Sequence, residues 1–346
     1  MLSCAVPQFR ISEATSHSLI SKTCLAYLAQ FGRPFYWDHS CPEDHPLARY
    51  AAKHWTHHGL RGDVNGDVRH QQLALNLFQC DNIFLNWLRI RDNWWQNPEA
   101  SRKIYFASRA GLSEVVRVLL EGGADVHAER WWCGLALHAA SSGGHKAIVK
   151  MLLEHGAHAN GGALQEASSA GHEAIVKMLL EHGADVNRGA LQHASSRGHE
   201  AIVKMLLEHG ADVNGGALQV ASSGGHEAIA KMLLEHGAGV NGEGEEYDGA
   251  LQKASFRGHG TIVKMLLEHG ADVNGGALQV ASSRGHEAIV KMLLEHGADV
   301  NGGALQEASS RGHEAIVKML LNHNADVNVY GPQYSGALQE TLSGGQ

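Results

Sequence analysis

The chain has 346 residues, which is enough for two domains, and a formal net charge of −8. This charge predicts no broad basic surface for nucleic acid. No uninterrupted apolar run of about 18 residues and no signal peptide are found, so neither a membrane span nor secretion is supported. The five cysteines, an odd number without a dense framework, fit a reducing compartment. We expect a cytoplasmic protein, with the nucleus left open.

The first hundred residues differ in composition from the rest. All seven tryptophans and all five cysteines lie at or before Cys133. The pattern predicts four helices, over Ser12–Phe31, from Pro46 to a stop at Gly59, over Val68–Gln79, and after an N-cap at Asp81. We therefore predict a helical module over residues 1–100 and a second domain over residues 101–346.

The second domain repeats one unit, best seen at Gly162–Arg188, GALQEASSAGHEAIVKMLLEHGADVNR. A first helix is predicted over Ala163–Ser169 and ends at Gly171. A second is predicted within His172–His182, where apolar residues recur at helical spacing and Glu173, Lys177 and Glu181 charge the opposite side. One unit is too small to bury a core alone, so we expect the units to stack.

The copies follow a mixed period. One alanine recurs at Ala107, Ala140, Ala167, Ala194, Ala221, Ala254, Ala281 and Ala308, and Thr341 replaces it in the last copy. The successive spacings are 33, 27, 27, 27, 33, 27, 27 and 33 residues. The sequence therefore predicts eight repeats and a partial ninth.

The segments Ala140–Gly144 (ASSGG), Gly171–Leu180 (GHEAIVKMLL) and Gly183–Asn187 (GADVN) resemble the ankyrin repeat, a turn with two antiparallel helices. This resemblance implies an all-α fold, an ankyrin-type helical solenoid behind the N-terminal module. An ordinary ankyrin unit has about 33 residues. The shorter copies lack six residues where the family has its β-hairpin finger, so most repeats are expected to have none.

Three fingers are expected to remain, at Ala128–Cys133, Glu243–Asp248 and Tyr330–Ser335. Fingers often contact partners in the ankyrin family, and aromatic residues are favoured at binding hot spots. The resemblance therefore implies partner contacts at Trp131, Trp132, Tyr247, Tyr330 and Tyr334.

The N-terminal module carries a second resemblance. Cys24–Leu28 (CLAYL), Pro46–His58 (PLARYAAKHWTHH) and Leu77–Ile90 (LFQCDNIFLNWLRI) resemble the stretch between the NACHT domain and the ankyrin array of fungal NLR-like (STAND) proteins. That family has a P-loop NTPase upstream, whereas this sequence contains no G-x-x-x-x-G-K-[ST] motif. The resemblance implies the ligand-sensing region of such a receptor without its NTPase.

Two columns of the first helices vary among otherwise similar copies. The first runs Ala139, Glu166, His193, Val220, Lys253, Val280, Glu307 and Glu340, and the second runs Gly143, Ala170, Arg197, Gly224, Arg257, Arg284 and Arg311. The two members in a copy are four residues apart and share one helix face, which lines the concave side in ankyrin-like stacks. Variation at exposed positions can be drift. Exposed charges elsewhere barely vary, however, which favours recognition.

The predicted binding residues on the concave columns are Glu166, His193, Arg197, Val220, Lys253, Arg257, Val280, Arg284, Glu307 and Arg311. The basic members suit an acidic peptide segment.

The 25 histidines raise the question of whether the chain binds a metal ion. Most recur in parallel columns, whereas a zinc site needs three or four ligands converging on one point. The local cluster of His39, Cys41, His45, His54, His57 and His58 lacks a recognised ligand spacing, and a metal-dependent enzyme there is a low alternative. Motifs of hydrolases and metalloproteases are missing, and Asp185 belongs to a turn motif. We predict no catalytic residues, cofactor or metal.

The sequence thus predicts a non-enzymatic module that binds a protein or peptide. The alternative is a structural scaffold or a truncated remnant without a dedicated ligand. Residues 336–346 supply a first helix without a second, so we also expect an exposed apolar face on the eighth repeat and self-association through it. The sequence does not name the partner, the oligomeric state or the curvature of the array.

Overall fold

A computed structural model describes residues 12–32, 45–62, 67–92, 103–127, 136–160, 162–241 and 249–327. Every regular element in these ranges is a helix, which confirms the predicted all-α fold. The chain divides into two compact units, Met1–Ala184 and Asp185–Gln346. The division lies within the repeats, so a domain boundary at residue 100 stays a prediction. No helix in the described ranges is long and apolar enough to cross a membrane.

The first unit begins with a helical module. It consists of α1 (Glu13–Leu28), a 3₁₀ turn η1 (Ala29–Phe31), α3 (Ala48–Arg61), α4 (Val68–Gln79) and α5 (Asp81–Asp92). Helix α1 packs on α3 and α4, and α5 packs on both α3 and α4. The buried rings of Trp55, Phe78, Phe84 and Trp87 form its core. The Trp87 ring centre lies 5.4 Å from that of Phe106 in the first repeat, so the aromatic core continues into the repeats of this unit.

Three predicted helix boundaries in this module are wrong. Helix α3 begins at Ala48 rather than at Pro46, because Pro46 and Leu47 lie in the turn before it. Helix α3 does not stop at Gly59, which is buried inside it, but continues to Arg61 with Gly62 as its C-cap. A Cβ atom at Gly62 would lie 2.5 Å from the backbone nitrogen of Ser18 in α1, so the close crossing of α1 requires glycine there. Asp81 is the first residue of α5 rather than its N-cap.

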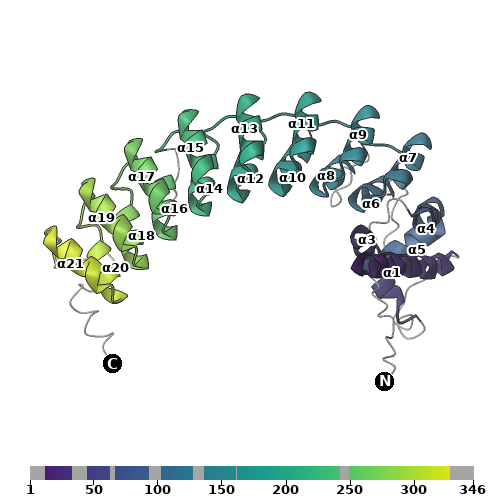
Figure 1. Cartoon of the computed structure of the whole chain (residues 1–346), viewed down its shortest axis with the longest axis horizontal. Helices are drawn as coiled ribbons and strands as arrows, with labels where there is room; N and C mark the ends of the chain where they lie inside the picture. Colours follow the sequence, from purple (N-terminus) through teal and green to yellow (C-terminus); the bar gives the residue numbers. More distant parts are fainter. Residues whose placement is uncertain are drawn as a thin grey trace, which may run out of the picture. The chain divides into compact units, whose positions relative to one another are not determined.

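Each repeat is a pair of short helices. In the first unit the pairs are α6 (Lys103–Arg109) with α7 (Ser113–Glu121), α8 (Ala136–Ser142) with α9 (Lys146–Glu154), and α10 (Ala163–Ala170) with α11 (Glu173–Glu181). In the second unit they are α12 (Ala190–Arg197) with α13 (Glu200–Glu208), α14 (Ala217–Gly224) with α15 (Glu227–Glu235), α16 (Ala250–Arg257) with α17 (Gly260–Glu268), α18 (Ala277–Arg284) with α19 (Glu287–Glu295), and α20 (Ala304–Ser310) with α21 (Glu314–Asn322). Within each unit the first helices form one layer and the second helices another (Figure 1).

Packing within the pairs follows the predicted pattern. Ile175, Val176 and Leu179 of α11 are buried, and His172 and His182 flank the helix as its caps. Gly183 has φ +77°, as expected of a left-handed residue after a helix. The first helices carry fully buried alanines such as Ala194, and the absence of a larger side chain lets adjacent first helices approach closely. The predicted partial ninth repeat and all three predicted fingers lie outside the described residues.

A histidine and a glycine join neighbouring repeats. The Nε2 atom of His226 donates to the carbonyl of Ser196 in the preceding repeat at 3.3 Å. Its imidazole covers Gly198, where a Cβ atom would lie 2.8 Å from His226 Cε1. The same bond to the preceding repeat is made by His145, His172, His259, His286 and His313. In these six repeats the first histidine is therefore a structural connector.

An asparagine ladder joins the loops after the second helices. In the second unit, Asn187 Oδ1 accepts from the backbone N–H of Asp212 at 2.8 Å, and Asn214 Oδ1 accepts from that of Gly239 at 3.0 Å. The ladder also continues past the predicted finger, because Asn241 Oδ1 accepts from Asp272 N at 2.7 Å. These bonds satisfy backbone donors in the turns between repeats.

Candidate functional site

The predicted columns lie at the surface of the first helices. In the second unit, His193, Arg197, Arg257, Arg284 and Arg311 are exposed. Val220, Lys253, Val280 and Glu307 are half-buried, and in the first unit Glu166 is exposed. Ala139, by contrast, is only 9% exposed, so the first column does not reach the surface at α8. We call the surface formed by the columns in α12, α14, α16, α18 and α20 the first-helix face.

One residue of this face does not belong to either column. Phe256 is 36% exposed, and the corresponding residue is serine in α8, α10, α12, α14, α18 and α20. The guanidinium of Arg284 lies 3.9 Å from the centre of its ring, and that of Arg257 lies 5.9 Å away. A large aromatic ring in place of a serine was the signal in the sequence that could have revealed it. The structure thus brings Phe256, Arg257 and Arg284 together on α16 and α18.

Basic side chains on the first and second helices have different partners. On the second helices, Lys264 pairs with Glu268 at 3.9 Å and Lys291 pairs with Glu295 at 3.8 Å, each one turn apart. On the first-helix face, Arg311 pairs with Glu307 at 3.4 Å. Arg257 and Arg284 instead contact the Phe256 ring, and no described carboxylate pairs with either. They form a basic, aromatic patch on a chain with a net charge of −8.

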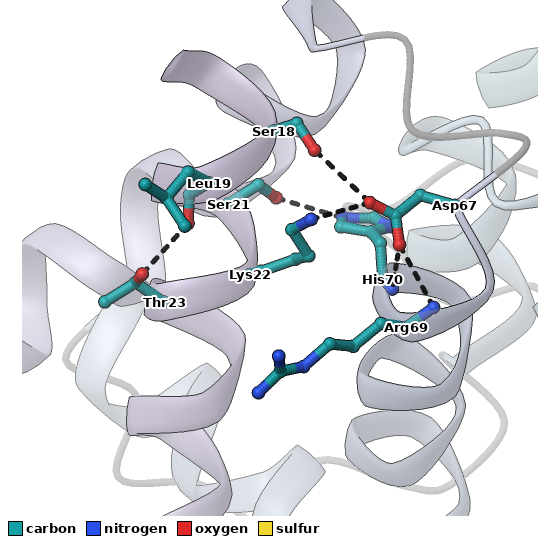
Figure 2. A network of polar contacts seen from close by, with 8 residues as sticks. All are labelled: Ser18, Leu19, Ser21, Lys22, Thr23, Asp67, Arg69 and His70. Carbon is teal, nitrogen blue, oxygen red and sulfur yellow. Dashed lines mark hydrogen bonds and ion pairs between the residues drawn. The ribbon is translucent and has the colours of Figure 1, made fainter. Parts of the chain in front are cut away.

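The helical module contains a serine, a histidine and an aspartate that could suggest catalysis (Figure 2). Ser21 Oγ lies 3.0 Å from His70 Nε2 and 2.8 Å from the carbonyl of Trp55. Because the single hydroxyl proton goes to the Trp55 carbonyl, Ser21 must accept from His70 Nε2–H, which is the reverse of nucleophile activation. Ser21 is also 0% exposed, so no substrate reaches it.

The aspartate of this network has a structural role. Asp67 Oδ1 accepts from the backbone N–H groups of Arg69 and His70 at 3.0 and 3.1 Å, so it caps α4. Its Oδ2 atom lies 2.7 Å from Lys22 Nζ, and this bond, together with the backbone donors, lowers the pKa of Asp67 to about 2. The network therefore ties α1 to the start of α4.

His45, His54, His57 and His58 of the predicted His/Cys cluster are among the described residues, whereas His39 and Cys41 lie outside them. The Nδ1 atoms of His17 and His58 are 2.6 Å apart, and the Tyr50 hydroxyl lies 2.8 Å from His58 Nε2. His45 instead contacts the Phe31 ring edge-on, and the His54 ring packs at a tilt against Tyr50. Within the described ranges, no group of three or more His, Cys, Asp or Glu side chains is arranged to hold a metal ion.

The repeat aspartates act in turns. Asp185 Oδ1 accepts from the backbone N–H of Asn187 at 3.0 Å, and Asp212, Asp272 and Asp299 make the same bond in later copies. The second histidine of each pair also bonds locally, as His182 Nδ1 donates to the Met178 carbonyl at 2.8 Å. The predicted finger residues Trp131, Trp132, Tyr247, Tyr330 and Tyr334 lie outside the described residues.

The stacked helix pairs define a helical repeat protein. A family model described as ankyrin repeats, in three copies, matches residues 103–190, 164–244, 191–277 and 251–331. The chain therefore belongs to the ankyrin-repeat family. Ankyrin repeats indicate a module for protein–protein interaction.

Three known proteins are similar to parts of this chain. The azaphilone pigments biosynthesis cluster protein L of Monascus ruber is 35% identical over 171 residues, which cover 43% of this chain and 36% of that protein. The probable E3 ubiquitin-protein ligase XBOS34 of Oryza sativa subsp. japonica is 43% identical over 67 residues, which cover 18% of this chain and 13% of that protein. The crystal structure of the human ASB11 ankyrin repeat domain superposes with a TM-score of 0.51 and 27% identity, covering 59% of this chain and 99% of that one.

Proposed function

We propose that the chain binds a protein partner through the first-helix face. The observation that carries this proposal is the exposed patch of Phe256, Arg257 and Arg284 on α16 and α18. Aromatic residues and arginine are enriched at the centres of protein interfaces. In the free protein the apolar ring of Phe256 is exposed to water, which is unfavourable. A partner that covers the ring removes this apolar surface from water and so gains binding free energy.

The partner is a peptide segment with acidic residues and an apolar side chain. Arg257 and Arg284 are free to pair with carboxylates, and the Phe256 ring offers an apolar surface between them. Arg197 and Lys253 add positive charge along the same face. Charge complementarity of this kind favours orientation and fast association.

A capture experiment tests the first-helix face together with Glu166 of α10. The chain is compared with a variant in which Glu166, His193, Arg197, Lys253, Arg257, Arg284, Glu307 and Arg311 are all changed to alanine. We expect partners to be lost from the variant while its helical content is unchanged. Changing Lys231, Lys264, Lys291 and Lys318 of the second helices to alanine supplies the control. Equal capture by all three proteins favours the scaffold alternative.

We further propose that the repeats form the ligand-sensing region of a fungal NLR-like receptor, without enzymatic activity and in the cytoplasm. The support is the resemblance of Cys24–Leu28, Pro46–His58 and Leu77–Ile90 to the segment that precedes the repeats in that family. Purification of the tagged chain at its native level, followed by mass spectrometry, is the test. Recovery of a NACHT-type NTPase, on this chain or bound to it, is expected, and its absence counts against this context.

A further inference from the structure

Three arginines stand at the same place in successive helices of the first-helix face. Arg197, Arg257 and Arg284 are the last residues of α12, α16 and α18, and all three are exposed. Among the residues that the structure describes, no carboxylate pairs with any of them. Arg311 of α20, by contrast, is paired with Glu307 at 3.4 Å. We call the three unpaired side chains the arginine row.

The spacing of the arginine row follows from the packing of the first helices. Helix α12 packs on α14, α14 on α16 and α16 on α18, with fully buried alanines in each of them. Packed helices lie about 8–10 Å apart, depending on the side chains at the contact. The backbones of Arg257 and Arg284 are therefore one such step apart. Arg197 lies two steps before Arg257, because α14 ends with Gly224 at this place.

A peptide in the polyproline II conformation matches this step. This helix has three residues per turn and rises about 3.1 Å per residue, so every third side chain points to the same side about 9 Å further along. A β-strand does not match, because its side chains alternate and residues three apart point to opposite sides. Carboxylates at every third residue of a polyproline II helix thus meet the arginine row in register.

The width of the face favours this conformation over an α-helix. An α-helix returns its side chains to one side after about seven residues, or about 10.5 Å, but it is about 10–12 Å wide with its side chains. On α16 the face extends from Lys253 to Arg257, which is about 6 Å along the helix axis. An extended chain is narrow enough to lie along this strip.

Phe256 adds an apolar contact beside the row. Arg284 covers part of its ring, with the guanidinium 3.9 Å from the ring centre, and the residue is still 36% exposed. Proline-rich segments bind through contacts of this kind with aromatic side chains, and their preformed backbone loses little entropy on binding. The same cation–π contact holds the guanidinium of Arg284 in place for a carboxylate.

We propose that the partner of the first-helix face binds as an acidic, proline-rich segment in the polyproline II conformation, laid across α12 to α18 with its acidic residues in a period of three. This inference rests on the proposed function and specifies its ligand. One acidic side chain pairs with Arg284, the one three residues away with Arg257, and the one six residues further with Arg197. The residue that faces Gly224 of α14 needs no charge.

Fluorescence anisotropy of the full chain with labelled peptides at low salt tests the period. The first probe is a Glu-Pro-Pro unit repeated four times and followed by one proline. The second has the same composition, but three prolines separate its glutamates, which turns successive carboxylates to different sides of the helix. A third probe replaces each glutamate of the first by glutamine. Circular dichroism checks that all three adopt the polyproline II conformation.

Two variants locate the binding. The test variant combines Arg257→Ala with Arg284→Ala, and the control combines Lys264→Ala with Lys291→Ala on the exposed side of the second helices. Both remove two positive charges from exposed positions of the same unit, and circular dichroism checks that both retain their helices.

We expect the first probe to bind at least about fivefold more tightly than the second, because only one carboxylate of the second meets the row at a time. The glutamine probe should bind at least about tenfold more weakly than the first. The arginine variant should lose the preference for the first probe, and the lysine variant should keep its affinity within about twofold.

The outcomes separate this inference from the proposed function. Equal binding of the two glutamate probes, weakened for both by the arginine variant, would overturn the period of three and leave an acidic partner of the first-helix face standing. Binding of the glutamine probe as tight as that of the first, equal affinity of the two variants, or no binding of any probe would overturn the acidic polyproline ligand. The capture experiment then still decides whether the face binds a protein.

Discussion

The guanidinium of Arg284 stacks on the ring of Phe256 from the neighbouring repeat, 3.9 Å from its centre. This contact joins α18 to α16 on the face where the copies differ most, at a position where the other described repeats have serine, apart from Arg109 in the first. An exposed cation–π contact contributes about 0.5–1 kcal/mol. Such a small contribution does not by itself account for an aromatic ring on the surface, and the proposed protein partner would cover that ring.

Gly198 is expected to be more sensitive to alanine than Gly210. Both have left-handed backbones, with φ of +78° and +80°, and either substitution should cost about 1–2 kcal/mol for that reason. At Gly198 the added Cβ also meets the His226 imidazole at 2.8 Å, whereas nothing lies within 4 Å at Gly210. Urea unfolding of Gly198→Ala and Gly210→Ala measures the difference.

Adding His226→Ala to Gly198→Ala separates the two effects. The clash disappears with the imidazole, so the combined variant should lose less stability than the sum of its single changes. Equal losses for Gly198→Ala and Gly210→Ala would show that the imidazole does not constrain this turn.

The Asn214→Ala variant is expected to weaken one junction between repeats. Its Oδ1 atom accepts from the Gly239 backbone N–H at 3.0 Å, and a lost bond of this kind costs about 1 kcal/mol. Amide exchange read by NMR should accelerate at Gly239 and leave Asp299 unchanged, because Asp299 bonds to Asn274 instead. Unchanged exchange at Gly239 would mean that the ladder does not protect its amide.

The first unit is expected to lose stability below about pH 6.5. Burial lowers the pKa of His70 and of His145, and burial with nearby His17, His57 and His54 lowers that of His58. The unfolded chain therefore binds more protons than the folded one as the pH falls below the unfolded histidine pKa of about 6.5. Stability is fully present above that value and decreases toward the folded pKa.

Melting followed at about pH 7.5 and about pH 5.5 measures this effect, with a lower melting temperature expected at the acidic pH. The carboxylate of Asp67, with its pKa lowered to about 2, loses its contribution only below about pH 4 and does not enter this window. The His70→Gln variant should show a smaller difference between the two pH values. Equal melting temperatures for the original chain would contradict the prediction.

Self-association through the eighth repeat is expected at high concentration. Leu321 of α21 is 42% exposed, whereas Leu294 and Leu267 at the same place in earlier repeats are 7% and 8% exposed. Val317 is likewise half-buried where Val290 is fully buried. Sedimentation velocity should show a concentration-dependent dimer that Leu321→Lys removes and Lys318→Glu does not. A monomer at every concentration would contradict this prediction.

Repetition made the helix pairs predictable. Each copy presents the same apolar spacing and the same terminal glycine, so the boundaries of α11 fall within one residue of their predicted positions. In the N-terminal module nothing repeats, and a glycine alone did not reveal where α3 ends. The end at Gly62 depends on Ser18 of α1, a contact between distant parts of the sequence. Tertiary packing of this kind overrides local glycine signals.

The candidate sites were predictable to different degrees. The columns came from comparing copies, and their arginines do lie at the surface. Phe256 was missed because an aromatic residue occurs at this position in a single repeat rather than along a column.

Site-specific photo-crosslinking tests the central claim most directly. A photoreactive phenylalanine analogue is placed at position 256 on the first-helix face or, as the control, at position 264 on the exposed side of α17. Each tagged chain is irradiated in cells of its source, and the adducts are identified by mass spectrometry. We predict a discrete protein adduct from position 256 that Arg257→Ala with Arg284→Ala abolishes, and none from position 264. The same adducts from both positions, or none from position 256, would contradict recognition through the first-helix face.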